Sequence, residues 1–196
     1  MLENICLSGG AEGADLAWGS AATEANHSVV HFTFKSHRTN APKEQICLLD
    51  DGFLRAADPA CHKANETLKR HFPPRSPFAA NLLRRNWYQI KDSTACYAIS
   101  TIKNGVVQGG TSWATAMFID KYDQATCPCY VFCQEAVHWF EWTGEWTPIY
   151  EPPIPTGVYT GIGSRNLTMV GSLAINILMN HKNIRRFDPC DYGHTK

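Results

Sequence analysis

Short apolar segments alternate with helix-like segments along most of the chain. The apolar segments span residues 5–7, 29–34, 94–102, 129–133 and 158–161. Helical spacing of apolar residues marks 14–25, 58–72, 78–91, 114–122 and 169–178. Strands buried on both faces are continuous apolar runs, and their alternation with helices is typical of parallel sheets. We therefore expect an α/β, Rossmann-like fold with a mostly parallel sheet flanked by helices.

A glycine-rich turn follows three apolar runs, at residues 5–7, 106–107 and 158–161. The first glycine turn spans residues 8–15, the second 109–112 and the third 161–165. A strand that turns through glycines into a helix collects backbone N–H groups and the positive end of the helix dipole at one place, which suits a phosphate. Glycine can also serve only to permit a tight turn. The recurrence of the turn favours a phosphate-bearing ligand.

Several polar side chains accompany these turns. Arg165 follows the third turn and offers a guanidinium fork to phosphate. Neighbouring helix positions point about 100° apart, so at most one of Arg84 and Arg85 faces a shared crevice. Asp15 caps its own helix or binds a ribose hydroxyl. The candidate ligand-binding residues are Ser8, Gly9, Gly10, Ala11, Gly13, Asp15, Lys35, His37, Arg85, Asn86, Gly109, Gly110, Thr111, Ser112, Gly161, Gly163, Ser164 and Arg165.

Residues 134–157 interrupt the alternating pattern. This segment holds three tryptophans and a proline-rich stretch. We interpret it as an irregular aromatic arm that packs on the domain or on a second subunit; stacking on a nucleic-acid base is the alternative. The length predicts a single domain over 1–196, closed by a strand–helix unit at 158–182.

Composition limits the possible functions. The chain has 196 residues, a hydrophobic content of 44% and no net charge. These values exclude a disordered chain and argue against a nucleic-acid-binding protein. No apolar stretch reaches the roughly 20 residues of a membrane span, and the start does not resemble a signal peptide. We expect a cytoplasmic protein whose eight cysteines are reduced.

No metal or cofactor is expected. Cys127, Cys129, Cys133 and His138 are close in sequence. Their spacing matches no familiar zinc site, and two of the cysteines bracket an apolar strand.

At its glycine turns, the chain resembles the SLOG superfamily. Residues 8–15 resemble the SGGAxGAD turn of that group, and residues 159–165 its GIGSR turn. Residues 84–86 and 109–111 resemble the RN and GGT elements of small phage and bacterial members. The superfamily includes LOG-type nucleotide phosphoribohydrolases, the Rossmann part of the DNA-processing protein A and sensors of nucleotide signals. The resemblance implies a Rossmann-like, nucleotide-binding, self-associating protein.

The order of these motifs departs from the superfamily. In typical members the GIGSR unit precedes the SGGAxGAD strand, whereas here it comes last. The chain therefore resembles a circularly permuted member. This predicts that the strand at 158–161 lies beside the strand at 4–7, with Gly163 near Gly10. A swap of the last unit into a neighbouring subunit is the alternative.

The resemblance also bears on catalysis. LOG-type hydrolases carry a glutamate in the turn that corresponds to residues 108–116, and no carboxylate occurs there. We therefore expect binding of a small nucleotide (ADP-ribose-like, cyclic or a nucleoside phosphate) without turnover, for sequestration or sensing of a signal. The resemblance to phage members implies a setting in phage–host defence. An N-glycosidic hydrolase that uses Asp15, Glu12 or Asp92, and a single-stranded DNA-binding module, are the alternatives.

Overall fold

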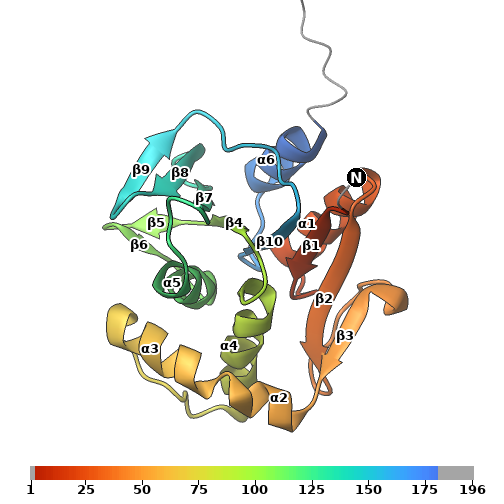
Figure 1. Cartoon of the computed structure of the whole chain (residues 1–196), viewed down its shortest axis with the longest axis vertical. Helices are drawn as coiled ribbons and strands as arrows, with labels where there is room; N and C mark the ends of the chain where they lie inside the picture. The colour runs from red at the N-terminus through yellow and green to blue at the C-terminus, as the bar shows by residue number, and fades with distance from the viewer. Residues whose placement is uncertain (1–2, 181–196) are drawn as a thin grey trace, which may run out of the picture.

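The computed structural model describes residues 3–180 and centres on an eight-stranded sheet (Figure 1). The strand order is β3-β2-β1-β10-β4-β7-β8-β9. The strands are β1 (Ile5–Ser8), β2 (Ser28–Phe34), β3 (Ile46–Leu49), β4 (Ala95–Ser100), β7 (Cys129–Cys133), β8 (His138–Trp142), β9 (Trp146–Ile149) and β10 (Val158–Gly163). All pairings from β3 to β7 are parallel, and β8 and β9 are antiparallel. The expected α/β fold with a mostly parallel sheet is confirmed.

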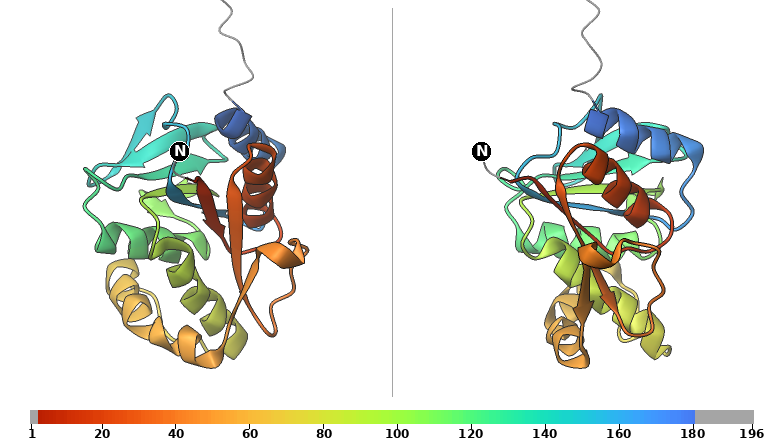
Figure 2. Two further views of the ribbon diagram at one scale, coloured as in Figure 1. Left: turned by 45° about the vertical axis from the view of Figure 1, so that its right-hand side comes forward. Right: turned by 90° about the vertical axis from the view of Figure 1, so that its right-hand side faces the viewer.

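Helices cover both faces of the sheet. The helices are α1 (Ala14–Glu24), α2 (Asp51–Ala56), α3 (Asp58–Leu68), α4 (Pro77–Ile90), α5 (Thr111–Lys121) and α6 (Met169–Asn180). One face carries α1 and α6, which pack on each other, and the opposite face carries α3, α4 and α5 (Figure 2). A separate hydrophobic core lies under each group of helices. A small hairpin of β5 (Ile102–Lys103) and β6 (Val106–Val107) leads into α5.

The two ends of the described chain meet in the middle of the sheet. Ile5 of β1 pairs in parallel with Val158 of β10, and β10 pairs on its other side with β4. The expected adjacency of the strands is therefore confirmed, and the strand order is not sequential. Gly163 lies against Ala14: a Cβ on Gly163 would come within 2.7 Å of the Ala14 Cβ.

The irregular structure expected for residues 134–157 is wrong for residues 138–149, which hold two strands. Strands β8 and β9 form an antiparallel hairpin that extends the sheet beyond β7. Trp139 is buried in the core beneath α1 and α6, and the rings of Trp142 and Trp146 pack edge to face at 5.1 Å. The tryptophans therefore pack on their own domain. Aromatic residues on both faces of β8 concealed the two-residue alternation that marks a half-buried strand.

The apolar residues at helical spacing in α6 are only partly buried. Met169, Leu173 and Ile177 are exposed, and the helix buries Gly171 and Ala174 with neighbouring larger residues. Small residues let the helix approach the sheet closely, since a Cβ on Gly171 would meet the Ile99 side chain at 2.9 Å. The expected end of this unit at 182, the tail and Cys190 lie outside the described residues.

No helix among residues 3–180 is both long enough and apolar enough to span a membrane.

Candidate functional site

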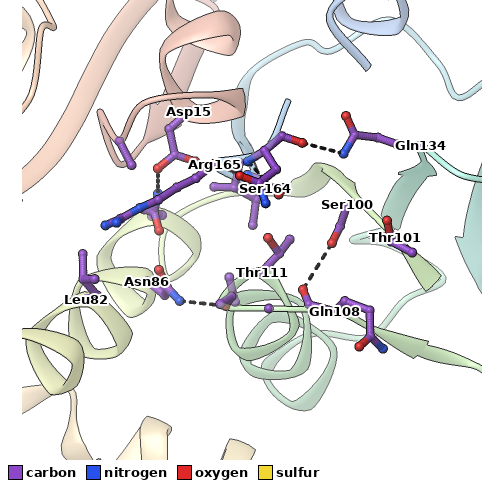
Figure 3. Close-up of a pocket in the computed structure, with 18 of the residues that line it drawn as sticks. Asp15, Leu82, Asn86, Ser100, Thr101, Gln108, Thr111, Gln134, Ser164 and Arg165 are labelled. Atoms are coloured by element: carbon purple, nitrogen blue, oxygen red, sulfur yellow. Dashed lines mark hydrogen bonds between the residues drawn. The ribbon is translucent and has the colours of Figure 1, made fainter. Parts of the chain in front are cut away.

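The connections of the sheet diverge at its centre. β1 leads through α1 to β2 on one side, and β4 leads through α5 to β7 on the other. Ligands of open α/β sheets bind where such connections diverge, outside the carboxyl ends of the strands. A cavity of about 710 Å³ lies there, lined by the loops after β1, β10 and β4 and by α4 and α5 (Figure 3). We call it the first cavity.

The first cavity brings together many of the residues that the sequence pointed to. Those that line it are Ala11, Asp15, Arg85, Asn86, Gly109, Gly110, Thr111, Gly163, Ser164 and Arg165. His37 lines a smaller neighbouring cavity, to which Ala11 and Arg165 also contribute. The remaining candidates line neither cavity: Ser8, Gly9, Gly10, Gly13, Lys35, Ser112 and Gly161.

The first glycine turn is largely occupied by the protein itself. The Ala14 N–H at the start of α1 donates to the Ser164 carbonyl at 3.0 Å. A Cβ on Gly13 would lie 2.4 Å from the Arg165 carbonyl oxygen. The Ser8 hydroxyl donates to the Asp15 carbonyl at 3.0 Å. The third turn thus fills the helix terminus at which the sequence suggested a phosphate.

A buried ion pair forms the floor of the first cavity. Arg85 Nη2 lies 3.3 Å from Asp15 Oδ2, and both side chains are almost fully buried. Arg85 Nη1 also donates to the Gly9 carbonyl at 2.6 Å. Burial raises the pKa of Asp15 above its usual value, and the Arg85 charge offsets part of that rise. Arg84 points away and pairs with Asp58, so one arginine of the two faces the crevice.

The second glycine turn opens into the cavity at the start of α5. The first N–H groups of a helix have no partner within the helix, and here they belong to the turn that lines the cavity. A Cβ on Gly110 would meet no atom within 4 Å. Asn86 Nδ2 donates to the Gly110 carbonyl at 3.2 Å (Figure 3), and Arg70 Nη1 donates to the Gly109 carbonyl at 3.1 Å. These side chains hold the turn, whose residues Gly109, Gly110 and Thr111 line the cavity.

The rim of the first cavity includes residues that sequence reasoning missed. Lys103 Nζ pairs with Glu135 Oε1 at 3.0 Å. The Gln134 amide donates to the Asn166 carbonyl and its oxygen accepts from the Thr168 N–H, which ties the loop after β7 to the loop after β10. The position of Gln134 just after an apolar strand was the available signal.

Two buried histidines lie beside the ion pair. Burial and the nearby Arg85 charge lower the pKa of His31 and of His37 to about 4. His37 Nδ1 lies 3.0 Å from the Thr33 hydroxyl, and His37 Nε2 lies 3.5 Å from Arg85 Nη1. Both nitrogens of His37 are therefore engaged inside the protein.

Carboxylates are few at this site. Among the described residues, Asp15 and Glu135 are the carboxylates that line the first cavity. Asp15 accepts from the Gly163 N–H and pairs with Arg85, and Glu135 pairs with Lys103. Each is engaged with a cation of the protein.

The fold is similar to that of a proposed molybdenum carrier protein from Syntrophus aciditrophicus SB, known from its crystal structure. The superposition has a TM-score of 0.52, covers 91% of this chain and 94% of the other, and includes 15% identical residues. No protein-family model matches the sequence. No curated protein sequence matches it either. At this identity the likeness establishes the fold alone.

Proposed function

We propose that this chain binds a small phosphate-bearing nucleotide in the first cavity, without cleaving it. The observation that carries the proposal is the start of α5, which lines the cavity together with Arg165. Backbone N–H groups at a helix N-terminus and a guanidinium together suit a phosphate. The cavity of about 710 Å³ falls within the range of small-molecule sites.

The engaged carboxylates of the first cavity support binding without cleavage. Cleavage of a glycosidic bond requires a carboxylate that stabilises positive charge or activates water. Asp15 and Glu135 are both paired with cations. The resemblance to SLOG proteins extends the proposal to sequestering or sensing a nucleotide signal, in a cytoplasmic, self-associating protein.

The likeness to a molybdenum carrier supports a second candidate ligand. An anion that contains molybdenum would also suit the amides at the start of α5 and Arg165. One titration experiment distinguishes the two candidate ligands.

Isothermal titration calorimetry tests the proposal. The ligands are ADP, ADP-ribose, cyclic AMP and sodium molybdate, and the variants are Arg165→Gln and, as a matched control away from the cavity, Arg55→Gln. We expect at least one nucleotide to bind the wild-type protein and R55Q equally, and R165Q about 10- to 100-fold more weakly. Binding of molybdate alone, or of none of the ligands, would contradict the proposal. Chromatography of the recovered nucleotide distinguishes binding from hydrolysis, which releases a free base.

A further inference from the structure

A second cavity of about 310 Å³ adjoins the first. It lies where β2 ends, beside the start of α4, and Ala11 and Arg165 line both cavities. Its other lining residues are Glu12, Ser36, His37, Arg38 and Phe78. A ligand that extends beyond Arg165 therefore enters a second chemical environment.

Aromatic side chains distinguish the two cavities. Among the described lining residues, Phe78 and His37 are the aromatic ones, and both belong to the second cavity. Phe34, which is buried, supports both rings: it stacks on His37 at a centroid distance of 5.4 Å and contacts Phe78 at 5.6 Å. Phe78 keeps 39% of its surface exposed. A supported, exposed aromatic ring is a surface on which a nucleobase stacks.

The polar residues that suit a phosphate, by contrast, lie mainly in the first cavity. The residues at the start of α5 and Lys103 line the first cavity and not the second. In the second cavity, His37 offers its ring rather than its nitrogens, because both nitrogens have partners inside the protein. Arg38 and Arg165 carry planar guanidinium groups, which stack on bases as well as bind phosphates.

We propose that the second cavity binds the base of the nucleotide, with Phe78 as its stacking partner, and that the phosphate lies across Arg165 in the first cavity. This inference rests on the proposed function and deepens it. It assigns the ligand class as nucleotides whose base and phosphate can lie on opposite sides of one guanidinium. It also assigns Phe78 as the residue that distinguishes a nucleotide from a sugar phosphate.

The test compares AMP with ribose 5-phosphate, which differ by the base alone. Dissociation constants are measured by calorimetry for the wild-type protein, Phe78→Leu, Phe78→Tyr and the control Phe53→Leu, an exposed phenylalanine on α2. We expect the wild-type protein to bind AMP more tightly than ribose 5-phosphate. F78L should weaken AMP binding roughly 5- to 100-fold and leave ribose 5-phosphate unchanged. F78Y and F53L should bind both ligands as the wild-type protein does.

Other outcomes of these titrations would overturn the base site. Equal binding of AMP and ribose 5-phosphate by the wild-type protein, or unchanged AMP binding by F78L, would overturn the base site and leave the proposed function standing. Failure of the wild-type protein to bind AMP would overturn the base site, whereas the proposed function falls only if ADP, ADP-ribose and cyclic AMP also fail to bind. If F78L unfolds, Ser36→Trp provides the second variant, because Ser36 is exposed and a large side chain there fills the second cavity. S36W should then weaken AMP binding selectively, and unchanged binding would overturn the proposal.

Discussion

The Asp15 carboxylate accepts a hydrogen bond from the Gly163 N–H at 3.1 Å, across 148 positions of sequence. The other oxygen of the same carboxylate pairs with Arg85 of α4. One side chain thus connects β10, the start of α1 and the helix on the opposite face of the sheet. This hydrogen bond is part of the contact between the first and third glycine turns. Residues of both turns line the first cavity.

Substitution of Asp15 should therefore destabilise the fold. Asp15→Asn leaves the Arg85 charge buried without a counter-charge, which costs about 3–5 kcal/mol in comparable cases. Asp58→Asn, which removes the partner of the more exposed Arg84, is the matched control and should cost about 1 kcal/mol or less. Urea denaturation measures both values. Equal effects of the two substitutions would show that the buried pair has no special role.

The close approach of α1 to β10 makes a second prediction. A Cβ on Gly161 would lie 2.6 Å from the indole of Trp18, which is fully buried. Gly161→Ala should lower the free energy of unfolding by about 1–3 kcal/mol through overpacking. Gly110→Ala should leave stability nearly unchanged, because a Cβ there meets nothing within 4 Å. A stable G161A protein would mean that this packing is looser than described.

The contribution of the Thr111 amide at the start of α5 can be tested separately from that of its side chain. Thr111→Pro removes an N–H at the first position of α5, where proline is tolerated once Gly110 shifts from its αR backbone to an extended one. Thr111→Val removes the hydroxyl and keeps the N–H. If the amide binds phosphate, T111P should weaken nucleotide binding about 10-fold, and T111V should not. Equal affinities for the two variants, measured by calorimetry, would exclude this amide from the phosphate site.

The buried His31 should make stability depend on pH. Its pKa is lowered to about 4 from a usual value of 6.5, so the folded state resists protonation that the unfolded state accepts. Below pH 6.5 the unfolded state therefore binds more protons, and stability falls as the pH drops towards 4. Between pH 6.5 and 5, His31→Gln should make the dependence of unfolding free energy on pH less steep, and the part that remains includes the contribution of His37. A profile that stays as steep in H31Q would assign the effect to other groups.

The exposed side of α6 bears on self-association. Met169, Leu173 and Ile177 follow each other at helical spacing and are exposed. If this face joins two copies, Leu173→Asp should shift the protein to a monomer in light scattering after size exclusion. Ser172→Asp, one position away on the same helix, serves as the control. A wild-type monomer would contradict the expected self-association.

Sequence patterns predicted the sheet and helices well where one period dominated, as in α4, which Ser76 caps and Pro77 begins. The hairpin of β8 and β9 was missed because aromatic residues on both faces conceal a two-residue period. The apolar spacing of α6 did not show which of its residues are buried, since close packing at Gly171 also decides its orientation. The sequence was sufficient to locate all three glycine turns. It could not tell that Ser164 would fill the start of α1 and leave the start of α5 open, because that depends on strands distant in the chain.

Native mass spectrometry of the protein purified from cells tests nucleotide binding most directly, followed by denaturation and identification of the small molecules released. We expect an intact nucleotide in a fixed ratio to the chain, absent from the Arg165→Gln variant purified in the same way. A free base with a ribose phosphate would indicate hydrolysis. A wild-type protein that carries no nucleotide, and takes none up when incubated with the cell's nucleotide pool, would contradict the proposed function.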